Sequence, residues 1–485
     1  MKSVHAPKSL AVVLFTFLLV ATSLLSGCKK DNVDDINTNA SLTYPIVDTY
    51  QGLTYDNLTQ ITPPTEGEAY YGQDAQYTGN SPSYTDNGDG AITDNVTNLT
   101  WTQSVSTFAM SWADASSYCD TLTTGGYSDW RLPTVKELWS IRDFSMGWPW
   151  VNTDYFYLVG DGSELAMHHS WTATRYLVES EYQNEQVMGE PSFIVNDWTG
   201  HIKAMSGNRF VRAVRGTETY GFNDFVDNND GTVTDNATGL MWSQDDSGEG
   251  FLWEDALAYA ENATLYGYDD WRLPNIKELQ SIADYSGVFP SMNTTFFNLT
   301  ELTNIKGQVD YPFYWSSTSN PLEGSDEVVD GGTVYAWFLA AGYNTDPDGN
   351  DLHGSGSICF GPKSEEYFSE LNPEIHRYNY VRLVRSGDVA ETPDGNPNCI
   401  NLDRVVVFPD GDIGGGGGNG GGPDFTSGVE YLATIGITVT AEELESIVGG
   451  PPTPTASELV ANFASNDIVI TEEQAQTLLD ILNLE

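Results

Sequence analysis

The chain carries an internal repeat, and this repeat constrains its fold more than any other feature of the sequence. Four motifs occur twice, and the second occurrence always lies 141 residues after the first. The repeated motifs are Asp86–Gly90 with Asp227–Gly231, Trp101 with Trp242, Trp112 with Trp253, and Trp130–Pro133 with Trp271–Pro274. Because the spacing is constant, residues 84–145 align with residues 225–286 without a gap. The chain is therefore expected to contain two copies of one folding unit.

Beyond this stretch the two copies differ in length. Trp171–Thr174 pairs with Trp315–Thr318, and Phe210–Arg215 pairs with Tyr380–Arg385, with the spacing increasing along the chain. The second copy thus carries insertions in its later half, where loops lengthen at a small entropic cost.

The start of each copy is typical of a β-hairpin followed by a helix. In the second copy the turn residues Asn229–Gly231 precede Thr232–Thr234, and Leu240–Trp242 follows, which indicates a hairpin. Apolar residues then recur at the spacing of one helical face. They are Trp253, Ala256, Leu257 and Ala260 in the second copy, and Trp112, Ala115 and Cys119 in the first. Since Cys119 aligns with Ala260, we interpret it as a small buried apolar residue.

A second helix is expected after each Trp-Arg-Leu-Pro motif. Thr134 with Glu137, and Asn275 with Glu278, have the spacing of a capping box. The later Trp-Ser-Ser-Thr and Tyr-Val-Arg-Leu-Val-Arg segments favour strands. The predicted fold class is α+β, with short strands, two helices in each copy and long loops.

Taken in order, these motifs resemble the Lcl C-terminal domain family. The matching segments are Asp230–Trp242, Trp271–Leu279, Trp315–Thr318 and Val381–Arg385. The resemblance covers about residues 84–385 and implies two tandem C-type-lectin-like modules, which we place at residues 81–218 and 219–390. It also implies a surface-exposed module, in one named case an adhesin for sulfated glycosaminoglycans.

The first 27 residues have the order of a secretory signal peptide. Lys2 and Lys8 come first, the apolar run Leu10–Val20 follows, and Leu25–Cys28 ends the segment. This run is shorter than the ~20 residues that a membrane span needs. The Leu-Ser-Gly-Cys tetrapeptide resembles the lipobox, which implies a lipid on Cys28 as the anchor. Lys29, rather than aspartate, follows the cysteine, and by resemblance to known sorting rules this favours the outer membrane.

The remaining segments have other compositions. Residues 28–80 are polar and lack periodicity, so we expect a stalk between the membrane and the body. Residues 391–424 include the glycine-rich run of residues 414–422 and are predicted to be a flexible linker. Residues 425–485 contain helix-start signals and are predicted to form a small helical segment.

The charge of the chain restricts its partners. The formal net charge is −49, from 69 acidic and 20 basic residues. Nucleic-acid binding depends on lysine and arginine that neutralise phosphates, so DNA and RNA are excluded as expected partners. The same charge opposes sulfated glycans. The sequence does not indicate an oligomeric state.

An acidic turn lies at the start of each copy, and these two turns are the one candidate metal site. No cofactor is expected, but these turns could gather carboxylates around Ca²⁺, which takes six to eight oxygen ligands. The candidate ligands are Asp86, Asp89, Asp94, Asp227, Asp230 and Asp235. Asp and Asn also occupy such turns for backbone reasons alone, and we expect this second interpretation.

Arginine and tryptophan side chains recur at matched positions, and we expect them to belong to the scaffold. Arginines within apolar motifs are usually partnered, and tryptophan beside Leu and Pro is usually buried. The matched residues are Trp130, Arg131, Pro133, Trp171, Arg212 and Arg215, with Trp271, Arg272, Pro274, Trp315, Arg382 and Arg385. An aromatic platform for a ligand would instead use an unmatched tryptophan. The unmatched candidates are Trp148, Trp150, Trp198 and Trp337.

The sequence contains no catalytic constellation. His168 and His169 are adjacent and lack counterparts in the second copy, and His201, His353 and His376 are isolated along the chain. No nucleophile elbow or phosphate-binding loop is present.

A disulfide between Cys359 and Cys399 is one option outside the cytosol, although spacing alone does not fix pairing. The predicted function is a non-catalytic, envelope-anchored binding or adhesion lipoprotein with an unidentified glycan or protein ligand. Two alternatives stay open: an envelope enzyme that acts on polysaccharide or a protein side chain, and a structural envelope component that binds through its C-terminal helices.

Overall fold

The structure is a computed structural model that describes residues 42–145, 149–158, 168–178, 191–321, 334–346, 348–368, 377–386 and 390–391, and five residues near the C-terminus. The chain divides into two units, residues 1–409 and 410–485. The signal segment, Cys28 and the glycine-rich run lie outside the described residues. In the second unit, the described residues Leu459, Phe463 and Ala475 are buried, and most of the predicted helical segment lies outside the description.

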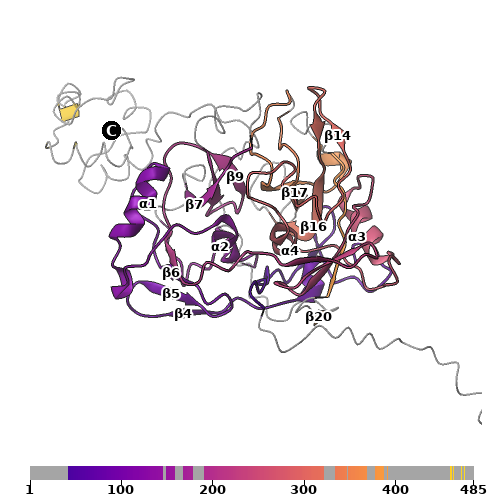
Figure 1. Cartoon of the computed structure of the whole chain (residues 1–485), viewed down its shortest axis with the longest axis horizontal. Helices are drawn as coiled ribbons and strands as arrows, with labels where there is room; N and C mark the ends of the chain where they lie inside the picture. Colours follow the sequence, from indigo (N-terminus) through magenta and orange to yellow (C-terminus); the bar gives the residue numbers. More distant parts are fainter. Residues whose placement is uncertain are drawn as a thin grey trace, which may run out of the picture. The chain divides into compact units, whose positions relative to one another are not determined.

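Each copy contains short strands and two α-helices (Figure 1). The elements of the first copy are β4 (Tyr84–Asp86), β5 (Ala91–Asp94), β6 (Thr100–Thr102), α1 (Trp112–Thr121), η2 (Thr124–Gly126), α2 (Val135–Ser140), β7 (His169–Arg175), β8 (Ser192–Asn196), β9 (Ile202–Met205) and β10 (Val214–Arg215). The elements of the second copy are β11 (Phe225–Asp227), β12 (Thr232–Asp235), β13 (Leu240–Ser243), α3 (Trp253–Glu261), α4 (Ile276–Ser281), β14 (Leu302–Thr303), β15 (Val309–Asp310), β16 (Phe313–Asn320), β17 (Tyr335–Ala340), β18 (Ile358–Pro362), η3 (Glu365–Tyr367) and β19 (Val384–Ser386). The fold class is α+β with mainly antiparallel sheets, as predicted.

The expected hairpins and helix starts are found in both copies. β5 pairs with β6 and β12 pairs with β13, both antiparallel. The Thr134 and Asn275 side chains accept from the backbone N–H of Glu137 and Glu278, and each glutamate accepts the N-cap N–H in return. The Tyr-Val-Arg-Leu-Val-Arg segment is a strand only at its end, in β19, and Tyr380 forms an isolated bridge with Tyr314.

The sheets repeat within the copies and also join them. Each copy has its own four-stranded sheet, in the orders β10-β6-β5-β4 and β11-β12-β13-β19. A six-stranded sheet runs in the order β16-β17-β18-β9-β8-β7, so three of its strands come from each copy. The seam is the antiparallel pairing of Ile358 in β18 with Ile202 in β9. The two tandem copies therefore share one six-stranded sheet.

The hydrophobic core confirms this continuity. One large cluster combines Trp101, Trp139 and Val195 of the first copy with Trp242, Leu279 and Trp337 of the second. Each copy adds a smaller cluster, around Trp130 and Trp171 in the first and around Trp271 and Trp315 in the second. Figure 1 shows α2 and α4 adjacent at the centre, with α1 and α3 at opposite ends.

The segment that the sequence predicted as a stalk is part of the folded body from residue 42 onward. It contains β1 (Thr54–Tyr55), β2 (Gln60–Ile61), η1 (Asp74–Gln76) and β3 (Tyr77–Thr78), and β3 pairs with β20 (Ala390–Glu391). The carbonyl of Thr49 accepts from Phe144 in the first copy, and Gln51 exchanges two hydrogen bonds with Ser319 in the second. The stalk prediction was wrong for residues 42–80. The polar residues of this segment are scattered and satisfy buried backbone groups, and a search for apolar periodicity does not detect such contacts.

Candidate functional site

Arg131 and Arg272 pair with the glutamates that cap the following helices. Arg131 donates two hydrogen bonds to Glu137, at 2.8 and 2.6 Å, and Arg272 donates two to Glu278, both at 2.6 Å. The same glutamates accept the N-cap N–H of α2 and α4. Each pair thus fixes a helix start to the preceding Trp-Arg-Leu-Pro segment.

The other matched arginines also act within the scaffold. Arg212 and Arg382 are fully buried, and each donates to three backbone carbonyls. Arg215 pairs with Asp129 and lies 3.8 Å from the Tyr127 ring centroid. Arg385 repeats this arrangement with Asp270 and Tyr268. All six matched arginines therefore bond to protein groups within their own copy.

Four of the matched tryptophans are core residues with satisfied indole N–H groups, whereas those of the buried pair Trp101 and Trp242 have no hydrogen-bond partner among the described residues. Trp130, Trp171, Trp271 and Trp315 are at most 3% exposed. Their indole nitrogens donate to carbonyls that also match between the copies, namely those of Thr124, Met110, Leu265 and Phe251. Pro133 and Pro274 contribute their carbonyls to Ala173 and Ser317, one strand away.

The aspartates of the acidic turns accept hydrogen bonds from nearby backbone N–H groups and do not form a metal cluster. Asp86 and Asp89 accept from Gly88 and Ala91, and Asp227 and Asp230 accept from Asn229 and Thr232. Asp94 and Asp235 are buried at their strand ends and accept backbone N–H groups there. In the described part of the chain, no group of three or more His, Cys, Asp or Glu side chains is placed to hold a metal ion.

The unmatched tryptophans do not provide an exposed platform. Trp150 and Trp337 are fully buried and Trp198 is 5% exposed, while Trp148 lies outside the described residues. Trp150 and Trp337 pack against Phe144 in the common core, with ring centroids 5.4 Å away in each case. The platform prediction was wrong for these three because their side chains are buried among the core residues.

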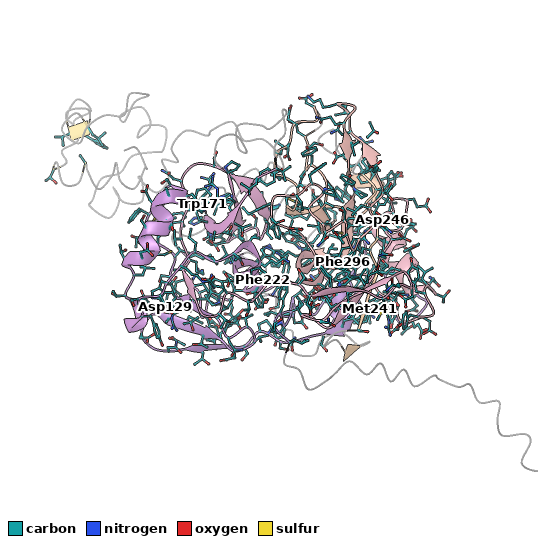
Figure 2. The ribbon with its side chains drawn as sticks, viewed as in Figure 1. Asp129, Trp171, Phe222, Met241, Asp246 and Phe296 are labelled. Carbon is teal, nitrogen blue, oxygen red and sulfur yellow. The ribbon has the colours of Figure 1, made fainter. Side chains whose placement is uncertain are left out.

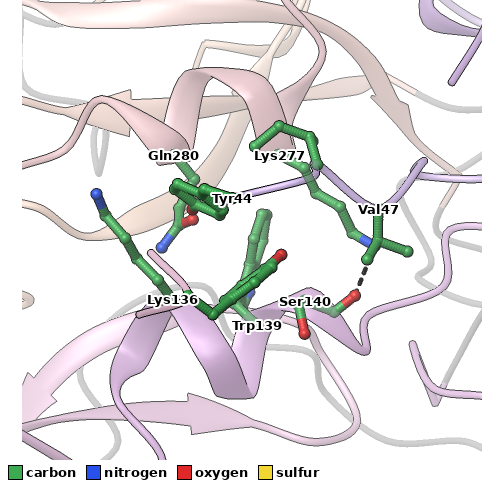
Figure 3. A pocket seen from close by; sticks show the side chains of 9 residues that line it. Tyr44, Val47, Lys136, Trp139, Ser140, Lys277 and Gln280 are labelled. Carbon is green, nitrogen blue, oxygen red and sulfur yellow. Dashed lines mark hydrogen bonds between the residues drawn. The ribbon is translucent and has the colours of Figure 1, made fainter. Parts of the chain in front are cut away.

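A reciprocal contact joins α2 and α4 across the junction of the copies, and Figure 3 draws its Lys277–Ser140 half. Lys136 donates to the carbonyl of Ser281 at 2.7 Å, and its counterpart Lys277 donates to the carbonyl of Ser140 at 2.9 Å. These residues match across the repeat, so the copies are related by an approximate twofold axis here. Burial lowers the pKa of both lysines to about 8. The cavity on this axis, covered by Tyr44, has a volume of only about 10 Å³, roughly the space of one water molecule.

His201 and His353 are isolated in the sequence but lie close to each other near the seam of the six-stranded sheet. His353 Nδ1 lies 3.6 Å from Cys359 Sγ, and Asn344 lies 3.4 Å from the same sulfur. Burial raises the pKa of Cys359 to about 12 and lowers that of His353 to about 3. The thiol is therefore protonated and the imidazole neutral at pH 7, which is the opposite of an activated cysteine. Sequence reasoning missed this cluster because its members lie in the unmatched halves of the two copies.

Cys119 and Cys359 are both buried, as expected for Cys119 on its helix face. Cys399 lies outside the described residues, so its bridge to Cys359 stays a prediction. No helix among the described residues is long and apolar enough to cross a membrane.

A larger hollow opens in the first copy between β6, α1 and the η2 turn. Its volume is about 260 Å³, and its lining includes Gly90, Gln103, Ser104, Tyr118, Leu122 and Thr124. The lining contains hydroxyl, amide and apolar groups and no charged side chain. It lies on a part of the repeat that aligns without a gap, so its counterpart in the second copy can be identified residue by residue.

The counterpart region in the second copy is filled by a tyrosine. Gly125 of the first copy aligns with Tyr266, and both have left-handed backbone, with φ values of 63° and 58°. The Tyr266 ring lies directly on Gly231, where an added Cβ would stand 2.2 Å from the ring. The aligned Gly90 of the first copy faces only a Thr124 methyl group, at 3.3 Å. The Tyr266 ring thus occupies the space over Gly231, whereas only the Thr124 methyl group lies within 4 Å of the added Cβ position at Gly90.

Comparison with known families gives a match over both copies. The Lcl C-terminal domain family matches residues 90–215 and 231–371, which together are more than half of the chain. No curated protein and no solved structure matches the chain.

Proposed function

The chain belongs to the Lcl C-terminal domain family, with two copies of that domain in its first unit, and from this premise we propose that it is a non-catalytic binding protein of the cell envelope. The two copies form a C-type-lectin-like body whose ligand is a glycan or a protein. A lipid on Cys28 holds the protein to the outer membrane.

One observation carries this proposal: the matched arginines and tryptophans make scaffold contacts, whereas the lining of the hollow differs between the copies at Ser104, Val105, Leu122 and Thr124. The shared arginines are paired or bonded to carbonyls, and the shared tryptophans are buried. At the aligned positions Gly125 and Tyr266, the second copy places a ring over its turn glycine and the first copy does not. A common scaffold whose surface residues differ is suited to binding different ligands.

The anchor is tested by labelling cells that express the full chain with radioactive palmitate. We expect label on the wild type and none on the Cys28→Ser variant, which should also leave the membrane fraction. Label on both chains would contradict the lipid anchor on Cys28.

The binding role is tested by applying the full chain, in detergent, to an array of neutral, sialylated and sulfated glycans and to immobilised extracellular-matrix proteins. We expect retention of at least one neutral glycan or protein. Sulfated glycans should not be retained, because the net charge of −49 opposes them. Loss of all binding by a protein that circular dichroism shows to be folded would contradict the proposal.

An envelope enzyme is the alternative, and the cluster of His201, His353 and Cys359 is the observation in its favour. That alternative predicts a chemical change in envelope polysaccharide or protein that disappears in the Cys359→Ala variant. The protonated thiol and neutral imidazole favour binding over catalysis.

A further inference from the structure

We propose that the hollow of the first copy binds one pyranose ring of a neutral glycan, and that Tyr266 closes the equivalent site in the second copy. This inference rests on the proposed binding function and assigns it a site, a ligand class and a stoichiometry of one ligand per chain.

The polar groups of the hollow are available for a ligand. Among the described residues, the side-chain hydroxyls of Ser104, Tyr118 and Thr124 have no hydrogen-bond partner, and the Gln103 amide makes only a 3.5 Å contact with Asp86. Burial raises the pKa of Tyr118, so its phenol stays a donor at neutral pH. A ligand rich in hydroxyl groups can both donate to and accept from such a set.

The apolar part of the lining suits the face of a sugar ring. The Tyr118 ring stands beside Leu122 in the lining, and Val105 and Val211 form its buried floor. Phe108, which is 59% exposed, packs edge-on against Tyr118 with ring centroids 6.2 Å apart. An aromatic ring that carries a polar group gives contact area to the C–H face of a pyranose while the surrounding hydroxyls bind its edge.

The charge and size of the hollow restrict the ligand further. No cationic side chain lines it, and Arg212, next in the chain to the lining residue Val211, gives its N–H groups to the carbonyls of Thr102, Gln103 and Tyr157. A carboxylate oxygen of Asp89 lies beside Gly125, only 3.2 Å from where a Cβ would stand. Anionic sugars are therefore disfavoured. The volume of about 260 Å³ is below the roughly 300–1,000 Å³ of pockets for drug-sized ligands, so a single ring is the appropriate size.

The second copy has the same backbone but cannot form this site. Tyr266 covers Gly231, and Asp245 and Asp246 stand where the first copy has Ser104 and Val105. Both carboxylates are engaged internally: Asp245 accepts from Asn298, and Asp246, labelled in Figure 2, accepts from Thr300 and Tyr314. Left-handed backbone is uncommon for a tyrosine, so its use at Tyr266 indicates a side chain retained to fill the space.

The test compares four full-length chains: the wild type, Gly125→Tyr, Ser104→Asp and Tyr266→Gly. The two first-copy variants introduce the residues of the second copy. Ser104 is exposed, so Ser104→Asp should fold even if Gly125→Tyr does not. Tyr266→Gly is the matched control, because it makes the reverse change at the equivalent position. Binding of the methyl pyranosides of glucose, galactose, mannose and N-acetylglucosamine is measured by saturation-transfer NMR and by titration calorimetry.

We expect the wild type to bind at least one of these glycosides with one site per chain. Affinity should fall at least tenfold in Gly125→Tyr and in Ser104→Asp and stay within twofold in Tyr266→Gly. Equal binding by the wild type and both first-copy variants would overturn the site while leaving the proposed binding function intact. Binding of none of the four probes would overturn the ligand class, whereas the loss of all glycan and protein ligands on the array would remove the proposed function itself.

Discussion

At the scale of single residues, the buried Arg272–Glu278 pair joins the Trp-Arg-Leu-Pro segment to the start of α4. Glu278 accepts two hydrogen bonds from Arg272 and one from the N-cap backbone, and it is almost fully buried. Arg215 and Asp129 also form two hydrogen bonds, but the Asp129 side chain is 60% exposed. Water and salt screen the second pair and not the first.

We predict that Glu278→Gln lowers the free energy of unfolding by about 3–5 kcal/mol, because it leaves a buried guanidinium without its counter-charge. Asp129→Asn, the exposed control, should cost about 1 kcal/mol or less. Urea unfolding followed by circular dichroism gives both values. Equal costs for the two variants would contradict the scaffold role of the buried pair.

Asp74 makes stability depend on pH. Burial, and then the neighbouring Asp48, raises the pKa of Asp74 to about 7, although Thr49 and Thr318 donate to its Oδ2 atom. An aspartate in the unfolded chain titrates at a pKa of about 3.9. The folded state therefore binds a proton more tightly, and this contribution to stability is complete below pH 4 and is lost as the pH rises to about 7.

We predict that Asp74→Asn raises the free energy of unfolding at pH 8 and flattens its pH dependence between pH 4 and 7. The asparagine oxygen can accept from the same two hydroxyls without a charge. Melting temperatures across this pH range, for the variant and the wild type, provide the measurement. A variant that is less stable than the wild type at pH 8 would show that the Asp74 carboxylate is stabilised by contacts other than those described.

At the scale of elements, the short helices α2 and α4 depend on their N-terminal caps. Both have six residues, too few to be stable without packing and capping. The Asn275 side chain accepts from Glu278 at 2.9 Å, and the backbone N–H of Asn275 donates to Glu278 in return. Since the N-terminal N–H groups of a helix have no partner inside it, this exchange satisfies two of them.

We predict that Asn275→Ala and Thr134→Ala each destabilise the protein by about 1 kcal/mol, while Asn275→Ser, which keeps a capping oxygen, costs less than half as much. Thermal unfolding of the three variants measures this. An equal loss in Asn275→Ala and Asn275→Ser would mean that the cap contributes little.

Helix starts could be predicted from the sequence, whereas the pairing of distant strands could not. The starts of α2 and α4 follow from four residues each, so local chemistry was sufficient to place them. The pairing of β9 with β18 joins residues more than 150 positions apart in unmatched parts of the copies, and no local pattern indicates it. The hollow was missed for a related reason: Gly125 is unremarkable by itself, and its meaning depends on the space that Tyr266 fills in the other copy.

At the scale of the whole first unit, the seam and the shared core make the two copies dependent on each other. Without the second copy, β9 would have an unpaired edge, and Trp139 would lose its contact with Trp337, whose ring centroid is 6.4 Å away. The buried lysines Lys136 and Lys277 would each lose the carbonyl that they reach across the junction. A single copy would therefore expose both apolar surface and unsatisfied polar groups.

We predict that both copies unfold in one cooperative transition. Hydrogen exchange with mass spectrometry, over a urea series, should give the same free energy of opening for peptides from β8 and from β17, although these strands belong to different copies. Glu278→Gln, which lies in the second copy, should then lower the protection of β8 as much as that of β17. If only β17 responded, the copies would be independent modules that pack together, and the shared sheet would be a contact rather than a common folding unit.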